Sequence, residues 1–412
     1  MNDAGMAVPA SATVTGAGTR SRWLVTTILL IAVTTAFFDR INVAVLFSNK
    51  DFQADIGVSD PAVMSLLMTA FVFPYGASMM LFSVSGDLFG PRKTLTAIAA
   101  ILAGIMAAMA AVSSYGFMLA GRVVIGVTEG PQFGAATATV KRWFPPHEQG
   151  VANAFWTIGS PLGSAIGFPL VIYLVAQYGW RVSFFVLAAL NAFIVLPAVW
   201  LFLRDRPADA PVAAEEKLSF AEGFALFARD QKFWLVVVYD SGVLIYLWGL
   251  NSWLPTYLQE ARHFDLASTS FYSSLPYILM LIGQLLFAWL ADVTGKRAAV
   301  CGVTLLMTGV FICLAAVVPD ATAAALCIAV SAGFWGGTTP TLFALGCQII
   351  PAKVTATGFG VYAGIANAIG SMAPLIIGVL VSRTGDFTAG LLFLVACCFA
   401  SSLAMIPLMR KY

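Results

Sequence analysis

The sequence predicts an all-α membrane protein with twelve transmembrane helices in two pseudo-symmetric six-helix bundles. Hydrophobic residues make up 60% of the 412 residues and charged residues only 10%, whereas a soluble domain carries about 25% charged residues. Apolar segments follow one another along the chain, each near the length of about 20 residues that a helix needs to cross a bilayer. Aspartate, proline and glycine residues at particular positions of the first half also recur at the same spacing in the second half.

The apolar segments define the expected spans, with short loops between them. The closed β-barrel alternative would need shorter segments of alternating hydrophobicity, which the sequence lacks. We predict spans over 23–47, 61–84, 94–113, 115–140, 150–176, 182–203, 232–258, 268–290, 298–318, 323–349, 356–382 and 388–409.

Two segments fall outside these spans. Residues 1–22 are mostly small and polar, and we expect a disordered cytoplasmic tail before a first helix that is not a removable signal peptide. Residues 204–231 form the longest polar stretch and predict a cytoplasmic linker. The linker separates an N-terminal bundle, 23–203, from a C-terminal bundle, 232–412.

The composition excludes several classes of protein. So little charge is atypical of disordered proteins and of nucleic-acid binders, and a net charge of +2 gives no reason to expect an acidic partner. The six cysteines lie in apolar segments without zinc-ligand spacing, so we interpret them as packing residues. Both histidines, His147 and His263, fall in predicted loops. We therefore expect no metal site and no cofactor.

The distribution of Lys and Arg predicts the orientation in the membrane. Cytoplasmic loops carry an excess of these residues. With a cytoplasmic N-terminus, sixteen of them fall on the cytoplasmic side and four outside, at Lys50, Arg181, Arg262 and Arg383. We therefore predict a multi-pass protein of the cell inner membrane with both termini in the cytoplasm.

The two halves of the chain repeat the same landmarks at one spacing. Two six-helix halves in the same orientation imply a parallel repeat, which suits alternating access to a site between them. A single chain then holds both halves, so no oligomer is required. The pairs, offset by 205 or 206 residues, are Asp87 and Asp292, Pro145 and Pro351, Pro169 and Pro374, and Gly179 and Gly385.

In these features the sequence resembles the major facilitator superfamily and, within it, the anion:cation symporter family of sugar-acid and organic-carboxylate permeases. The resemblance runs from about Trp23 to Leu408. It is carried by Gly86-Asp87-x-x-Gly90-x-Arg92-Lys93, Asp39-Arg40-x-Asn42, Gly121-Arg122-x-x-x-Gly126-x-x-Glu129-Gly130, Arg142-Trp143-Phe144-Pro145, Gly179-Trp180-Arg181, Trp253-Leu254-Pro255-x-Tyr257-Leu258, and Asn367 with Pro374.

Charged residues inside the spans are the candidate transport machinery. Each costs roughly 2.5–3.5 kcal/mol at the centre of a helix, so these residues must pair, face water or take up protons. Arg122 and Glu129 lie on one helix face, about 10 Å apart, and partners on the first helix fit between them. The five residues are Asp39, Arg40, Arg122, Glu129 and Asp240.

Chemistry suggests a role for each charge. Arginine stays ionised and binds a carboxylate through a two-pronged contact, so we predict that Arg40 binds an organic anion. Glu129, near the middle of its helix, and Asp39 are the candidate proton-coupling carboxylates. The alternative is an ion-pair network that only fixes helix packing. Asp240 is either a packing or gate contact or a third proton site.

The resemblance implies further roles. Arg122 modulates the coupling carboxylates, Tyr75 lines the substrate site, and Asp87 with Arg92 locks the cytoplasmic side of the outward-open state. Sugar-acid members often have glutamine where this chain has Ser160, and some have tyrosine where it has Phe37. These two departures favour a less hydroxylated acid, aromatic or short-chain. Further lining candidates are Ser160, Asn251, Gln284, Trp335 and Asn367.

The sequence favours a secondary active transporter that imports an organic carboxylate, either a sugar acid or an aromatic or short-chain acid, together with protons. Its partners are then a small organic anion, protons and the lipid bilayer, with no nucleic acid. The alternative within transport is an organic-anion exchanger or a drug exporter. More remote alternatives are an intramembrane enzyme and a non-transporting receptor. The sequence shows neither a catalytic motif at membrane depth nor a sizeable soluble domain.

Overall fold

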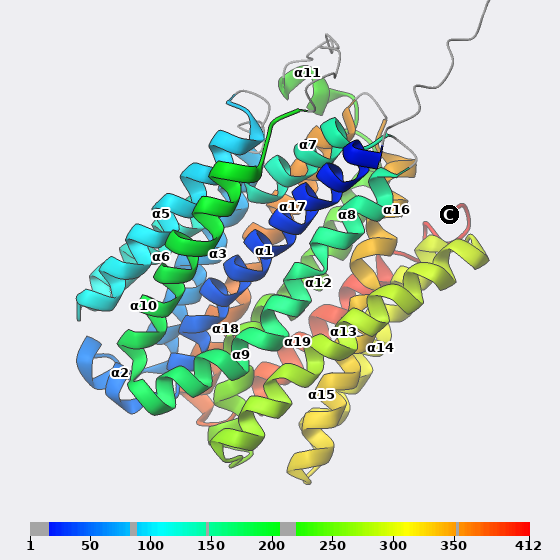
Figure 1. Ribbon diagram of the computed structural model, residues 1–412. Coiled ribbons are helices and arrows are strands. Elements are labelled where there is room, and N and C mark those ends of the chain that lie inside the picture. Colours follow the sequence, from blue (N-terminus) through cyan, green and yellow to red (C-terminus); the bar gives the residue numbers. More distant parts are fainter. Residues whose placement is uncertain (1–15, 83–88, 146–147, 207–219, 352–353) are drawn as a thin grey trace, which may run out of the picture.

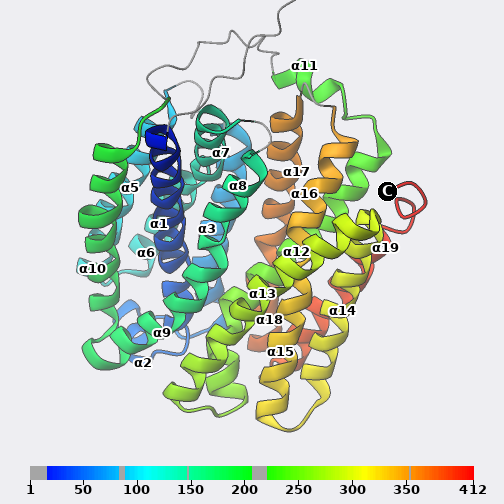
Figure 2. The ribbon, with the colours of Figure 1, turned by 45° about the vertical axis from the view of Figure 1, so that its right-hand side comes forward.

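A computed structural model of the chain describes residues 16–82, 89–145, 148–206, 220–351 and 354–412, and no strand occurs among them. Figures 1 and 2 show two bundles of helices side by side. The start of α1 and the short helix α11 lie at one end of the molecule, which we call the linker face. The opposite face carries α2 and the turn between α18 and α19.

The first bundle contains the helices up to the end of η2. In this bundle α1 is the most enclosed helix, since 83% of its most apolar stretch of 18 residues is buried. Its elements are α1 (Gly16–Leu46), α2 (Lys50–Ile56), α3 (Pro61–Phe82), α5 (Pro91–Ala111), α6 (Tyr115–Glu129), α7 (Gln132–Trp143), α8 (Gln149–Thr157), α9 (Gly159–Tyr178), α10 (Trp180–Leu190), and the π-helices η1 (Asn191–Val195) and η2 (Ala198–Phe202).

The second bundle follows the short helix α11 (Phe220–Ala225). Its elements are α12 (Gln231–Thr256), the π-helix η3 (Tyr257–Ala261), α13 (Leu266–Thr294), α14 (Arg297–Val317), α15 (Ala321–Gly336), α16 (Thr338–Ile349), α17 (Thr355–Gly370), α18 (Met372–Thr384) and α19 (Thr388–Leu403).

These helices make up the twelve predicted spans. In the described part of the chain, ten continuous helical segments are long and apolar enough to cross a membrane. The shorter apolar helix Thr388–Leu403 supplies another span. The remaining span, the fourth along the chain, consists of α6 with α7. Its buried Arg122 and Glu129 make it less apolar. The prediction of an all-α fold with twelve spans is confirmed.

Short side chains begin many of these helices, and glycines end several of them. Asn49 accepts a hydrogen bond from the backbone N–H of Phe52 at the start of α2, and Asp265 does the same for Ser268 in α13. These contacts satisfy backbone donors that the first helical turn leaves free. Gly295 and Gly385 end α13 and α18 in the left-handed conformation, at φ of 66° and 69°, which glycine adopts without strain.

Breaks within the spans repeat between the halves. The fourth span is interrupted between Glu129 and Gln132, and the tenth between Gly336 and Thr338, at an offset of about half the chain. The fifth and eleventh spans are interrupted in the same way, near Ile158 and Ser371. The sequence predicted continuous spans here. The internal repeat inferred from loop landmarks thus extends to irregularities within the helices.

Several predicted boundaries are wrong. Helix α1 begins at Gly16, so residues 16–22 are helical and not part of a disordered tail; residues 1–15 lie outside the described part of the chain. The last helix ends at Leu403, and the chain continues in turns to residue 411. The linker contains α11, and Phe227 is buried against Phe233. Apolar packing thus extends beyond the spans into the linker. Hydropathy averaged over the length of a membrane span does not reveal it.

Glycines let the helices approach closely. A Cβ on Gly126 would lie 2.3 Å from the Phe71 carbonyl oxygen, and one on Gly163 would lie 2.6 Å from that of Thr34. The first contact joins α6 to α3 and the second joins α9 to α1. Small residues commonly mediate such contacts between membrane helices.

Substituting Gly283 tests this packing. In Gly283→Ala the new Cβ would lie 1.8 Å from the carbonyl oxygen of Gly333, so α13 and α15 must separate. We expect this variant to lose about 3 kcal/mol or more of stability, at the upper end of the cost of overpacking. Thermal unfolding of purified protein measures the loss. Gly104→Ala is the matched control because its Cβ meets nothing within 4 Å; equal melting temperatures would contradict the packing argument.

Contacts join the two bundles from the middle of the molecule to the opposite face. The rings of Phe47 and Trp253 lie 5.1 Å apart. The Ser382 hydroxyl donates a 2.7 Å hydrogen bond to Asp60, and this bond contributes to a pKa of the Asp60 carboxyl below its usual value. Asp60 is therefore ionised at neutral pH. These contacts hold the opposite face closed in this conformation.

Candidate functional site

The centre of the first bundle holds a direct ion pair. Nε of Arg40, on α1, donates a 2.6 Å hydrogen bond to Oε2 of Glu129 at the end of α6. Both side chains are almost completely buried, at 3% and 0% exposure. Glu129 is the last residue before the helix break at Gly130, so its carboxylate lies where α6 gives way to α7. A buried carboxylate therefore compensates the buried cation in this conformation.

Aromatic rings surround the Arg40 guanidinium. Its central carbon lies 4.4 Å from the ring centroid of Phe37 and 4.7 Å from that of Tyr75. Phe71 and Phe133 lie farther away, at 5.7 and 5.9 Å. Arginine stacks readily on aromatic faces, and such contacts stabilise a cation that has left water.

Arg122 is held by the protein itself. Its Nε donates to the Leu67 carbonyl oxygen at 3.0 Å, and Nη1 donates to the backbone oxygen of Asp39 at 3.4 Å. Nη2 contacts the sulfur of Met68 at 3.4 Å. All three nitrogens of Arg122 therefore have partners. Arg122 ties α6 to α1 and α3, and its hydrogen bond to Asp39 is to the backbone and not to the carboxylate.

The Asp39 carboxylate points toward the sixth span. Its Oδ2 accepts a 2.9 Å hydrogen bond from Nδ2 of Asn191. Asn191 is the first residue of the π-helix η1, and Nδ2 also donates to the Leu187 carbonyl oxygen at 3.1 Å. Single-turn π-helices inside α-helices often occur at functional sites. Sequence reasoning missed Asn191, although an amide in an otherwise apolar span was the available signal.

Several buried polar atoms of this cluster lack a hydrogen-bond partner among the described residues. They are Oδ1 of Asp39, Nη2 of Arg40, Oε1 of Glu129 and Oε1 of Gln132. Buried polar groups are nearly always satisfied in proteins, so such a concentration needs an explanation. A bound anion, water or a proton can satisfy these atoms. Gln132, just beyond the break in the fourth span, is a second residue that the sequence analysis missed.

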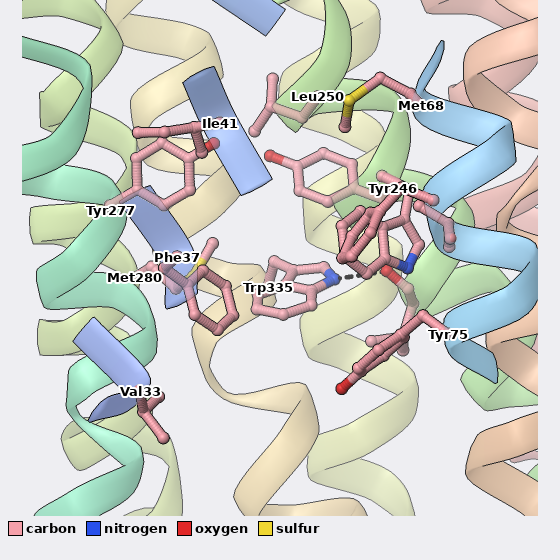
Figure 3. Close-up of a cluster of buried hydrophobic side chains, with 14 of the residues drawn as sticks. Val33, Phe37, Ile41, Met68, Tyr75, Tyr246, Leu250, Tyr277, Met280 and Trp335 are labelled. Carbon is pink, nitrogen blue, oxygen red and sulfur yellow. Dashed lines mark hydrogen bonds between the residues drawn. The ribbon is translucent and has the colours of Figure 1, made fainter. Parts of the chain in front are cut away.

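The second bundle presents aromatic side chains to the middle of the molecule. In the view of Figure 3, Trp335 and Tyr246 lie between Phe37 and Tyr277 on one side and Tyr75 on the other. Trp248 lies edge-on to Tyr75, with ring centroids 6.3 Å apart. These four residues, Tyr246, Trp248, Tyr277 and Trp335, are called the aromatic wall below.

The predicted lining residues differ in their surroundings. Asn251 and Asn367 are buried and bind side chains of the aromatic wall: Asn251 accepts from the Tyr277 hydroxyl, and Asn367 accepts from Nε1 of Trp248 at 3.0 Å. Ser160 and Gln284 are half-buried. Tyr75 is buried beside Arg40. The structure therefore places Tyr75, Asn251 and Asn367 beside the Arg40–Glu129 cluster or the aromatic wall. This cluster and the wall together are called the central layer below.

The predicted gate is only partly visible. Asp87 lies outside the described residues. Arg92, the second residue of α5, donates through its guanidinium to the Trp200 carbonyl oxygen, at 3.1 and 2.6 Å. Its backbone N–H donates to Asp205 at 2.8 Å. These contacts anchor Arg92 to the end of the sixth span in the same bundle.

Asp240 lies apart from the central cluster. It is in α12, nearer the linker face, and is 8% exposed. Its neighbour Tyr239 donates a 2.8 Å hydrogen bond to the carbonyl oxygen of Cys301 on α14. In the described part of the chain, no cluster of His, Cys, Asp or Glu has the composition of a metal site.

The Asn191 contact has a measurable effect on stability. Asn191→Leu removes the hydrogen bond to the Asp39 carboxylate, and we expect a loss of about 1–3 kcal/mol, the usual cost of leaving a buried polar group unsatisfied. Thermal unfolding of the purified variant measures it. In an Asp39→Leu background, which removes the oxygen that accepts from Asn191, the same substitution is expected to cost at least about 0.5 kcal/mol less, because the two residues are coupled. Strictly additive losses would show that Asn191 acts independently of Asp39.

Comparison with known proteins decides the family. The family model described as Major Facilitator Superfamily matches residues 29–374, which is most of the chain. The chain belongs to this superfamily. Members are transporters, so the prediction that the protein is not an enzyme is confirmed.

Curated relatives of this major facilitator chain carry organic anions. A probable sulfoacetate transporter of Cupriavidus necator is 28% identical over 89% of each chain. A probable galactarate/D-glucarate transporter of Bacillus subtilis is 26% identical over 97% of this chain and 94% of its own. A D-galactonate transporter of Escherichia coli is 25% identical over 98% of both. The predicted resemblance to sugar-acid and organic-carboxylate permeases of this superfamily is confirmed.

Solved structures show the same fold. A bacterial homolog of the human lysosomal transporter Spinster, in an inward-facing and occupied conformation, superposes with a TM-score of 0.76. The match covers 95% of this chain and 97% of the other at 15% identity. At that identity the likeness concerns the fold, and function must be argued from the site.

Proposed function

We propose that this protein is a secondary active transporter that imports an organic carboxylate together with protons by alternating access. The observation that carries the proposal is the buried ion pair of Arg40 and Glu129, with an unpartnered nitrogen and an unpartnered oxygen beside the interface of the two bundles. A cation there attracts an anion, and a carboxylate there can release the cation by taking up a proton.

The ion pair suggests how the two fluxes are coupled. While Glu129 is ionised it occupies Nε of Arg40 and repels a second anion. Protonation of Glu129 removes that charge and frees the guanidinium for the substrate. The occupied site then carries one cation, one anion and a neutral acid, so the bundles can move without an uncompensated charge at the centre. Asp39 is the second candidate for a coupling carboxylate, held in place by Asn191.

The orientation is part of the proposal. The excess of Lys and Arg in the loops supports a cytoplasmic linker face with both chain ends inside, in the inner membrane. The contacts of Phe47 with Trp253 and of Asp60 with Ser382 then lie on the outer side. This conformation is closed toward the outside. Substrate entry requires these contacts to separate as the bundles rock about the central layer.

An organic-anion exchanger with the same fold is the second candidate. It would also use Arg40, but it would not need a carboxylate that changes its protonation state. The direct pairing of Glu129 with Arg40 favours symport, because any anion that binds Nε must displace a carboxylate or find it neutral.

External pH in weakly buffered cells tests the proposal. Cells expressing the protein receive sugar acids, aromatic carboxylates or short hydroxy acids. Alkalinisation with one of these anions, absent in cells that carry the empty vector, is expected because each imported anion removes protons from the medium. Entry of the labelled anion without alkalinisation would reject symport and favour exchange or facilitated diffusion.

A further inference from the structure

We propose that the substrate is a singly charged anion with a hydroxyl-poor, apolar body, and that an aromatic carboxylate is its best match. This inference rests on the proposed function and concerns the same site. It follows from which polar groups of the central layer already have hydrogen-bond partners within the protein. The first bundle contributes one cation with an unpartnered nitrogen, Arg40, and the second bundle contributes the rings of the aromatic wall.

The number of available cations sets the charge of the substrate. Among the described residues, the buried arginines in the central layer are Arg40 and Arg122. Each nitrogen of Arg122 already contacts a protein oxygen or sulfur. Arg40 alone of the two retains an unpartnered nitrogen, Nη2. A second anionic group on the substrate would therefore face Glu129 and Asp39 without a cation of its own.

The polar ends of the aromatic wall are already occupied. The Ser331 hydroxyl donates to the Ile328 carbonyl oxygen, so the 2.6 Å contact between Tyr246 and Ser331 uses the Tyr246 proton. Nε1 of Trp335 donates to the Val243 carbonyl oxygen at 2.8 Å. The wall therefore has ring faces and edges to offer, and these two donors are not available to a ligand.

The remaining members of the wall are satisfied in the same way. The Tyr277 hydroxyl donates to Asn251, and Nε1 of Trp248 donates to Asn367. The Asn367 amide nitrogen donates in turn to the Ala363 carbonyl oxygen at 2.8 Å. Within this group of side chains, Nδ2 of Asn251 is the polar atom left without a partner.

A polyhydroxylated acid fits this layer poorly. Each of its hydroxyls would lose water on binding and would need a new partner, because a buried polar group without one is destabilising. In the first bundle the acceptors that remain, Oδ1 of Asp39, Oε1 of Glu129 and Oε1 of Gln132, belong to the charged cluster. Phe37 stands beside Arg40 where a tyrosine would offer a hydroxyl. A planar apolar body instead gains contact with the rings of Phe37, Tyr75 and Trp335, and in the view of Figure 3 Trp335 lies between the other two. Aromatic pairs of this kind are favourable beyond the area they bury.

Calorimetric titration of the purified protein with four anions tests the proposal. The anions combine one or two charges with few or many hydroxyls: benzoate, D-galactonate, sulfoacetate and D-glucarate. We expect benzoate to bind at least tenfold more tightly than the other three, with a dissociation constant that rises at least tenfold in Arg40→Ala. Tighter binding of D-galactonate would overturn the hydroxyl-poor body, and tighter binding of sulfoacetate would overturn the single charge.

A set of variants locates the body of the anion. Trp335→Leu removes the ring and is expected to weaken benzoate binding at least fivefold, whereas Trp335→Phe restores part of the affinity. Trp234→Phe, at a partly exposed position near the linker face, is the control. Unchanged affinity in Trp335→Leu would contradict the role of the wall. The comparison of the four anions on the unaltered protein decides the proposal even where a variant does not fold.

The outcomes separate this inference from the proposed function. Preference for a sugar acid or a dianion that still depends on Arg40 would reject the substrate class and leave anion transport standing. Failure of all four anions to bind in an Arg40-dependent way would reject both.

Discussion

Arg40→Ala is expected to lower the initial rate of anion uptake at least about 100-fold. The variant removes the cation with an available nitrogen in the central layer and leaves the Glu129 carboxylate buried without its partner. Losing one partner of a buried, hydrogen-bonded charge pair in a binding site costs about 2–5 kcal/mol, and the middle of that range corresponds to a factor of more than 100 in binding. Uptake of labelled anion into cells or proteoliposomes at equal protein levels measures the effect.

Two further variants define what Arg40 contributes. Arg40→Lys keeps the charge but loses the planar, two-pronged contact, so an intermediate loss of about tenfold is expected. Arg383→Ala, at an exposed position in the last turn of α18, is the control and is expected to transport normally. If Arg40→Ala is unstable, pairing it with Glu129→Gln removes the orphaned charge and is expected to restore folding but not transport. Normal uptake in Arg40→Ala would reject Arg40 as the anion site.

Glu129→Gln is expected to separate anion movement from proton movement. Glutamine resembles the protonated acid and cannot lose a proton, so Arg40 stays free for the anion. Exchange of labelled for unlabelled anion across the membrane should continue within about threefold of the normal rate. Accumulation driven by a pH gradient should fall from about tenfold per pH unit and per proton to no accumulation.

Counterflow and gradient-driven uptake in the same proteoliposomes distinguish these two activities. Glu148→Gln is the matched control, because Glu148 pairs with Arg22 near the linker face and is partly exposed. If Glu129→Gln retained gradient-driven accumulation, the coupling role would belong to another group, with Asp39 the next to test.

Much of the fold could be predicted from the sequence. Apolar length located the spans, because a lipid environment requires long helices and leaves few alternatives. The spacing of repeated prolines and glycines indicated two related halves. The cost of burying charge identified Asp39, Arg40, Arg122 and Glu129, which the structure places together in the first bundle. These inferences depend on strong, local physical constraints.

The arrangement of partners could not be predicted in the same way. The sequence suggested that residues of the first helix lie between Arg122 and Glu129. It did not indicate that Arg122 would bind backbone oxygens, nor that Asn191 would hold Asp39. Such contacts depend on helix rotation and on the π-helix η1, which no periodicity reveals. Hydropathy likewise could not show the burial of Phe227 beyond the spans.

The central claim, that anion and proton move together through the Arg40–Glu129 pair, is tested most directly in proteoliposomes. A pH gradient of one unit is imposed, acid outside, with the transported anion at equal concentration on both sides and the membrane potential clamped at zero. Liposomes without protein correct for passive entry. The account predicts net inward accumulation that approaches about tenfold for each coupled proton. Anion levels that remain equal on both sides despite rapid exchange would contradict it.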